Sequence, residues 1–140
     1  MILIVDDFAD GAESLCRLLT ATGYDCRWVS GGREALALVR SHPAEMPLLV
    51  VLDEMMPDLS GVEVLQALRA DPRTVHTPVI MYSAGFDVAK EDLAKVMGAL
   101  AWIPKGSGNV VTTLQSIGEW YERVGGVKRQ RAEEPDKRRV

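Results

Sequence analysis

Five polar side chains stand where short apolar runs of the chain come to an end. Asp6 and Asp7 follow the first run, Asp53 follows the third, and Ser83 and Lys105 lie at the ends of the fourth and fifth. Carboxylates are preferred ligands of Mg²⁺, and a carboxylate oxygen can also attack phosphorus. If folding brings these residues together, the chemistry that their types support is transfer of a phosphoryl group to an aspartate.

The charges of such a site must balance. Three carboxylates at one point repel one another, and without a counter-charge their pKa values would rise. A divalent cation would relieve that repulsion, and Lys105 would add a fixed positive charge. Ser83 could donate a hydrogen bond to the new phosphoryl group. No separate general base is needed, because an ionised carboxylate is already a nucleophile.

The elements that must position these residues are strands and helices in alternation. Each apolar run is short and nearly continuous, which is typical of strands buried on both faces. The second run contains Arg27, which indicates an edge position. The predicted strands cover residues 2–5, 26–29, 48–52, 78–82 and 99–103.

Helical patterns fill the intervals between the runs. Ala12, Leu15, Leu18 and Leu19 recur on one helical face, and Gly23 follows as a stop signal. Similar stripes recur after each later run, and each has a polar residue in front that could cap the helix. The candidate caps are Ser30, Ser60, Asp87, and either Ser107 or Asn109.

Five strand–helix repeats predict an α/β fold with a parallel sheet covered by helices on both faces. Right-handed crossovers leave few topologies. We expect a flavodoxin-like, doubly wound (βα)5 fold with strand order 2-1-3-4-5. Its ligand site would lie at the carboxyl ends of the strands, where the five polar residues would meet.

Length and charge limit the other possibilities. The chain has 140 residues, which suits one domain, over 1–122, and a charged, disordered tail over 123–140. Residues 1–120 carry 16 acidic and 9 basic side chains, for a net charge of −7, whereas residues 121–140 carry 4 and 7, for +3. The acidic body argues against nucleic-acid binding by the folded domain.

Membrane and redox roles find no support in the sequence. No apolar run reaches the length of a membrane span, and the N-terminus lacks the pattern of a secretion signal, so we expect a cytoplasmic protein. Cys16 and Cys26 are the two cysteines, and their spacing is typical neither of a disulfide framework nor of a metal site.

These motifs, in this order, resemble the receiver domain of two-component response regulators, of the CheY-like superfamily. The resemblance covers roughly residues 1–122, and its most specific part is a strand that ends in Asp53, followed by Pro57 and Gly61 in the loop before a helix. The stretches that carry it are Ile2-Leu3-Ile4-Val5-Asp6-Asp7, Val50-Val51-Leu52-Asp53-Glu54-Met55-Met56-Pro57-Asp58-Leu59-Ser60-Gly61, Pro78-Val79-Ile80-Met81-Tyr82-Ser83-Ala84 and Pro104-Lys105.

The resemblance implies a signalling switch that is not a metabolic enzyme and catalyses only its own phosphorylation and dephosphorylation. Asp53 would accept the phosphoryl group from a sensor histidine kinase or a histidine phosphotransfer protein. Asp6, Asp7, Asp53 and the Met55 carbonyl would bind Mg²⁺. Lys105 would contact the phosphoryl oxygens. Ser83 would supply the switch hydroxyl.

The resemblance also implies an output surface, and the sequence departs from the family near it. Residues 87–121, from Asp87 to Tyr121, would form the face that binds an unknown downstream protein or a second copy of the chain. Trp102 stands where the family usually has Tyr or Phe. Proline precedes Lys105 here, whereas in the family it usually follows the lysine.

Two other functions remain open at this stage. One is a binding module that has kept the fold but works without phosphorylation. The other is an aspartyl-phosphate hydrolase, which would need a second acid near Asp53; the adjacent Glu54 should point elsewhere, because neighbouring side chains on an extended segment diverge. The chain could be a stand-alone regulator, a phosphorelay intermediate or part of a longer protein.

Overall fold

The computed structural model describes residues 1–85, 87–106 and 108–129. Strands and helices alternate along these residues, with one short 3₁₀ helix between the second helix and the third strand. The strands are β1 (Ile2–Val5), β2 (Cys26–Val29), β3 (Leu49–Leu52), β4 (Val79–Ser83) and β5 (Trp102–Pro104). The helices are α1 (Ala9–Ala21), α2 (Gly32–Ser41), η1 (Pro43–Glu45), α3 (Gly61–Ala70), α4 (Val88–Val96) and α5 (Val110–Arg123).

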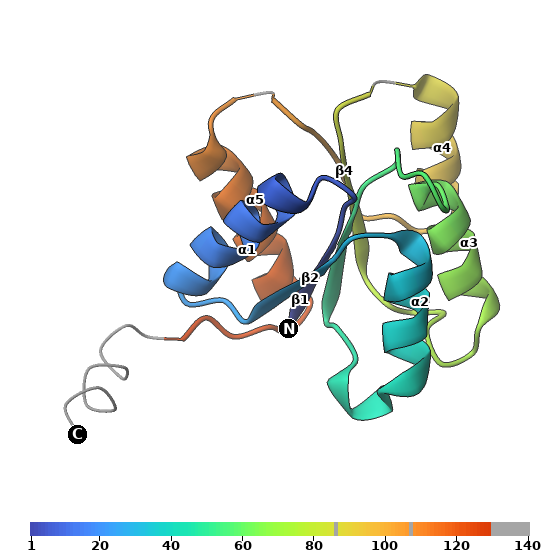
Figure 1. Cartoon of the computed structure of the whole chain (residues 1–140), viewed down its shortest axis with the longest axis horizontal. Coiled ribbons are helices and arrows are strands. Elements are labelled where there is room, and N and C mark those ends of the chain that lie inside the picture. The colour runs from blue at the N-terminus through green and yellow to red at the C-terminus, as the bar shows by residue number, and fades with distance from the viewer. Residues whose placement is uncertain (86, 107, 130–140) are drawn as a thin grey trace.

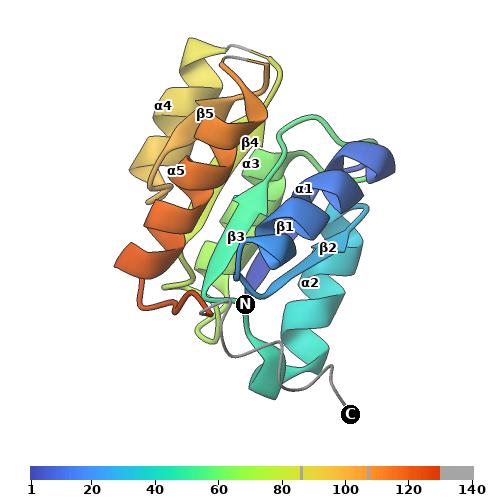
Figure 2. The same cartoon turned by 90° about the vertical axis from the view of Figure 1, so that its left-hand side faces the viewer.

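The strands form one parallel sheet in the order β2-β1-β3-β4-β5, as the alternation predicts. Helices α1 and α5 cover one face, and α2, α3 and α4 cover the other (Figures 1 and 2). Every residue of β1 and β3 is buried, because both faces of these central strands are covered. The flavodoxin-like prediction is confirmed, including the edge position of β2.

Two apolar cores hold the layers together. On one face of the sheet, Leu3 and Val50 pack with Leu65 of α3. On the other face, Ile4 and Val51 pack with Ile117 of α5. Because successive residues of a strand point to opposite faces, the continuous apolar runs supply both cores at once.

The fifth strand begins later than predicted. It covers Trp102–Pro104, whereas the apolar pattern predicted residues 99–103. Ala99 instead closes the end of α4, since its N–H donates to the Ala94 carbonyl. Pairing with β4 starts at Met81 and Trp102. Apolar character alone did not distinguish this partly exposed connection from the strand that follows it.

Most predicted helix caps are confirmed. Ser60 forms a complete capping box with Glu63, and Asp87 and Asn109 each accept a hydrogen bond from the third residue of their helix. The Ser30 prediction is wrong, because the N-cap of α2 is Gly31, which has no side chain to accept a bond. The alternative cap Ser107 lies outside the described residues.

Asp58 replaces the missing cap of α2. It lies in the loop between β3 and α3, and its two carboxylate oxygens accept hydrogen bonds from the backbone N–H groups of Gly32 (3.2 Å) and Arg33 (2.9 Å). These bonds lower the pKa of Asp58, with the bond from Arg33 the strongest cause. The loop that follows Asp53 is thereby tied to a second helix.

The first residues of the predicted tail contact the domain. The Arg129 N–H donates to the Gly23 carbonyl at 2.8 Å, and the Lys128 ammonium lies 5.6 Å from the centre of the Tyr24 ring. The tail prediction for residues 130–140 lies outside the described residues.

We expect Asp58→Ala to lower the free energy of unfolding by about 1 kcal/mol, because two N–H groups of α2 lose their acceptor. Urea unfolding measures the change. Since the folded-state pKa of Asp58 is depressed, its stabilisation is present above the unfolded pKa of roughly 4 and is lost as pH falls through the folded pKa. Asp58→Asn, which keeps one acceptor oxygen, should cost less than alanine. Equal stability of all three proteins at pH 7 would contradict the capping role.

Candidate functional site

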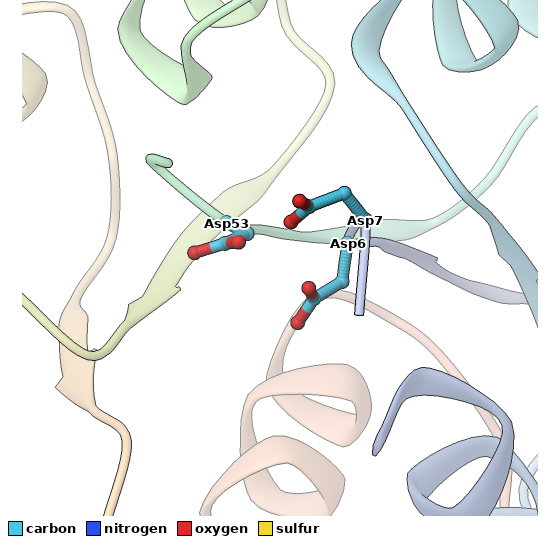
Figure 3. A group of neighbouring side chains, drawn as sticks. All are labelled: Asp6, Asp7 and Asp53. Atoms are coloured by element: carbon cyan, nitrogen blue, oxygen red, sulfur yellow. The ribbon is translucent and has the colours of Figure 1, made fainter. Parts of the chain in front are cut away.

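The carboxyl ends of β1 and β3 bring the three predicted aspartates together. Asp6 and Asp7 directly follow β1, and Asp53 directly follows the neighbouring β3 (Figure 3). One carboxylate oxygen from each residue lies within 4.8 Å of the other two. Asp6 and Asp53 are buried, with exposed fractions of 4% and 5%, whereas Asp7 is exposed.

Burial and the neighbouring carboxylate raise the pKa of Asp53 to about 6. Loss of water around the carboxylate is the larger cause, and repulsion from Asp6 is the second. Lys105, the Ser83 hydroxyl and the Met55 N–H act in the opposite direction. At pH 7 the carboxylate of Asp53 is therefore mostly ionised and can act as a nucleophile.

Lys105 neutralises part of the negative charge. Its Nζ lies 2.6 Å from Asp6 Oδ2 and 3.6 Å from Asp53 Oδ2. Burial by itself would lower the pKa of Lys105, but the bond to Asp6 and the charge of Asp53 outweigh it, so the pKa is raised. Lys105 thus remains a cation.

Backbone contacts position Lys105 although no proline follows it in the sequence. The Lys105 N–H donates to the Ser83 carbonyl at 2.9 Å, which fixes the residue at the end of β4. Gly106 then turns the chain with a φ of 78°, a left-handed conformation that glycine adopts without strain. The departure from the family at this position therefore leaves the ammonium within reach of Asp6 and Asp53.

Ser83 lies at the end of β4 with an exposed fraction of 1%. Its hydroxyl faces Asp53 closely enough to help lower the pKa of that carboxyl group. It makes no hydrogen bond of standard geometry with the described residues. A buried hydroxyl without a well-placed hydrogen-bond partner destabilises the folded protein. Ser83 would therefore gain a favourable hydrogen bond if an acceptor group became attached to Asp53.

Gly61 allows the loop after Asp53 to close. A Cβ at Gly61 would collide with the Asp53 carbonyl oxygen and would lie 2.9 Å from the Cα of Glu54. The Gly61 N–H donates to the Glu54 carbonyl at 2.9 Å, which joins the two ends of the loop. The Asp…Pro…Gly spacing in the sequence therefore reflects a close backbone approach directly beside Asp53.

The residues present suit Mg²⁺. The aspartates offer hard oxygen ligands from one small region, and the exposure of Asp7 leaves room for coordinating water. Burial and, as the second cause, repulsion from Asp6 raise the pKa of Asp53, so a divalent cation would be stabilised there.

Sequence reasoning missed two contacts around the site. One is the capping of α2 by Asp58. The other is an ion pair in which Lys90 Nζ of α4 lies 3.3 Å from the buried Glu54 Oε2. The residues that interact in these contacts lie 25, 26 and 36 positions apart, so no local spacing could reveal them.

Comparison with known proteins agrees with the fold. Residues 2–114 match the family described as the response regulator receiver domain. The chain belongs to this family. It is 38% identical over 104 residues to the DNA-binding response regulator MtrA of Mycobacterium tuberculosis, an alignment that covers 74% of this chain and 43% of that protein.

A more distant relative has another activity in its name. A probable cyclic di-GMP phosphodiesterase of Vibrio cholerae is 34% identical over 104 residues, which cover 74% of this chain and 23% of that protein. This chain therefore spans less than half the length of the curated relatives described here, and what they share with it is the receiver domain.

Solved structures show the same architecture. A CheY-like receiver domain protein of Methanospirillum hungatei has a TM-score of 0.75 and 27% identity, over 88% of this chain and 94% of that one. The chemotaxis protein CheY4 of Vibrio cholerae has a TM-score of 0.73 and 27% identity, over 84% and 95%. Within the described ranges of this receiver, no helix is long and apolar enough to cross a membrane.

We expect Asp53→Asn to be more stable than the wild type when no divalent cation is present. Because the folded-state pKa of Asp53 is raised to about 6, its favourable contribution is complete below the unfolded pKa and is lost as pH rises through 6. The variant should gain about 1–2 kcal/mol at pH 8, and the difference should shrink toward pH 4.5.

Urea unfolding in EDTA across this pH range measures the effect. Asp10→Asn, which removes an exposed acid from α1, serves as the control and should show no comparable gain. A less stable Asp53→Asn protein at pH 8 would show that the buried carboxylate is not under electrostatic stress.

Proposed function

We propose that this receiver accepts a phosphoryl group on Asp53 in a Mg²⁺-dependent step and thereby switches its protein interactions. The main support is the arrangement at the carboxyl ends of β1, β3 and β5. There an ionised Asp53 lies beside the carboxylate of Asp6 and within 3.6 Å of the Lys105 ammonium. In the proposed assignment Asp6, Asp7, Asp53 and the Met55 carbonyl hold the metal.

The proposed reaction is an in-line displacement. An oxygen of Asp53 attacks the phosphorus of a phosphohistidine, the P–N bond breaks, and the imidazole leaves. Bound Mg²⁺ would supply charge neutralisation for the phosphoryl oxygens. Lys105 contributes a second positive charge on the same side, and Ser83 donates a hydrogen bond to the product.

The proposed donor is a sensor histidine kinase or a histidine phosphotransfer protein. An apolar groove with a volume of about 230 Å³ lies beside the site. Phe8, Leu15 and Val110 line it together with Asp6 and Lys105. The exposed fractions of Phe8 and Val110 are 63% and 53%. Apolar side chains next to a reactive centre suit a protein partner, which must bring its histidine to Asp53.

The proposed output surface is the face formed by residues 87–121. Helix α4 and strand β5 border a cavity of about 200 Å³ that is lined in part by Lys95, Leu100 and Trp102. The indole N–H of Trp102 is buried and has no hydrogen-bond partner among the described residues. Trp102 is half-buried, so a rotation of its side chain would alter the surface that a downstream protein or a second copy of the chain meets.

The other functions receive less support from the site. A phosphorylation-independent module would have no use for the set that Asp6, Asp53 and Lys105 form. A hydrolase would need an acid aimed at the leaving group, and the Glu54 oxygens face Val62 and Lys90 instead. We propose a cytoplasmic location for the protein. We also propose that the receiver covers residues 1–122 and is followed by a charged tail over residues 123–140. The only reactions that it would catalyse are its own phosphorylation and dephosphorylation.

We expect acetyl phosphate and Mg²⁺ to add one phosphoryl group to the wild-type protein, because small phosphoryl donors need only the acceptor site. Intact-mass spectrometry measures the adduct. Asp53→Asn should remain unmodified, and EDTA should prevent labelling of the wild type. Lys105→Met should slow labelling by about 10- to 100-fold, since one charge that stabilises the transition state is lost.

Lys95→Met is the matched control for this experiment. It removes an exposed lysine of α4 that is not part of the aspartate cluster, so labelling should proceed at a rate close to that of the wild type. A phosphorylated Asp53→Asn protein would refute the assignment of the acceptor. Continuous turnover of small phosphate esters would instead favour the hydrolase.

We expect Trp102 fluorescence to change when beryllium fluoride and Mg²⁺ occupy the site, because the side chain should rotate between half-buried and exposed positions. Replacing Trp28 and Trp120 by Phe leaves Trp102 as the single tryptophan. Adding Trp102→Phe to this background provides the blank. Unchanged emission at saturating ligand would show that Trp102 is a static aromatic residue.

A further inference from the structure

Glu54 is a buried carboxylate that closes the loop after the phosphoacceptor. Its exposed fraction is 4%. Oε1 accepts a hydrogen bond from the Val62 N–H at 2.8 Å, and its backbone carbonyl accepts one from Gly61 at 2.9 Å. Both donors belong to the first turn of α3, so Glu54 is held in a fixed position directly beside Asp53.

The second oxygen of Glu54 has a different partner. Oε2 makes no hydrogen bond of standard geometry among the described residues, and it lies 3.3 Å from Lys90 Nζ. The attraction is therefore mainly one of charge, between a fully desolvated carboxylate and a half-exposed lysine. Lys90 lies in the first turn of α4, where its N–H also donates to the Asp87 cap.

Among the described residues, few other side chains hold the N-terminal end of helix α4. Ala94 is its one buried residue among those described. Its C-terminal end is fixed by Arg69, which donates to the Met97 carbonyl at 2.8 Å and also to the carbonyls of Val75 and Thr77. The Glu54–Lys90 pair is thus a principal side-chain link between the start of α4 and the rest of the domain.

The same end of α4 is joined to Ser83 by a short connection. Residues 84–87 link the switch hydroxyl at the end of β4 to the first residue of α4. If Ser83 moves toward a phosphoryl group, so short a connection would pass part of that displacement to the first turn of α4. Glu54 cannot follow, because two backbone groups of α3 hold it.

We propose that Glu54 is a positioning residue of the phosphorylation site, which through Lys90 holds α4 in its unphosphorylated position and so opposes activation. The inference rests on the proposed function, and it assigns a role to a residue that the phosphoryl-transfer chemistry does not use. A ligand shifts the equilibrium between the two positions of α4 only by the difference between its affinities for them. The free energy needed to break the ion pair therefore lowers the apparent affinity of the protein for a phosphoryl group or its analogue.

The test is a titration of the full chain with beryllium fluoride in saturating Mg²⁺, a non-covalent phosphoryl analogue. Binding is followed by ¹⁹F NMR of the bound fluoride. Lys90→Met and Glu54→Gln should each bind the analogue about threefold or more tightly than the wild type, the size expected for one partly exposed ion pair. The double variant should bind no more tightly than either single variant, since all three lack the same pair.

Two controls separate this role from a general structural one. Lys90→Arg keeps the positive charge and should restore the wild-type affinity. Lys95→Met removes an exposed lysine of the same helix, with no ion pair among the described residues, and should leave the affinity unchanged. Hydrogen exchange of the free proteins should show faster exchange in α4 of Lys90→Met than of the wild type, and no change in α2.

The outcomes distinguish the two proposals. Failure of the wild type to bind the analogue would refute the proposed function itself. Normal binding by the wild type, with equal or weaker binding by Lys90→Met and Glu54→Gln, would refute the role of the ion pair alone. Lower stability of the variants together with unchanged affinity would reduce the pair to a structural contact.

Discussion

Repulsion between carboxylates at the end of a parallel sheet is the constraint on which this structure depends. Adjacent strands β1 and β3 place Asp6 and Asp53 in a buried position, where the pKa of Asp53 rises to about 6. Lys105 supplies the counter-charge within the protein. Three carboxylates and one ammonium leave the site with a net negative charge, which Mg²⁺ could neutralise.

Much of the fold was predictable because its signals are local. Continuous apolar runs mark strands buried on both faces, and their alternation with helical stripes restricts the topology. The start of β5 was missed because residues 99–101 are apolar yet form the connection between α4 and β5. The cap of α2 was missed because Asp58 is distant in sequence and near only in the folded chain.

The residues of the candidate site likewise include some that the sequence predicted and some that it did not. Asp6, Asp53, Ser83 and Lys105 were found because strand ends of a parallel sheet meet at one edge, which is a topological rule. That rule could not reveal the ion pair between Glu54 and Lys90. It depends on where α4 lies relative to α3, and that position is set by long-range contacts such as those of Arg69.

The loop between Asp53 and Gly61 is connected to α2, α3 and α4, the three helices that cover one face of the sheet. Asp58 ties the loop to α2, Gly61 and Val62 tie it to α3, and Lys90 ties Glu54 to α4. The three connections differ in strength. Those to α2 and α3 use backbone donors at helix N-termini, whereas the link to α4 is one side-chain ion pair. A perturbation at Asp53 should therefore displace α4 before it displaces α2 or α3, and under the proposed function this asymmetry would direct the change toward the proposed output surface of residues 87–121.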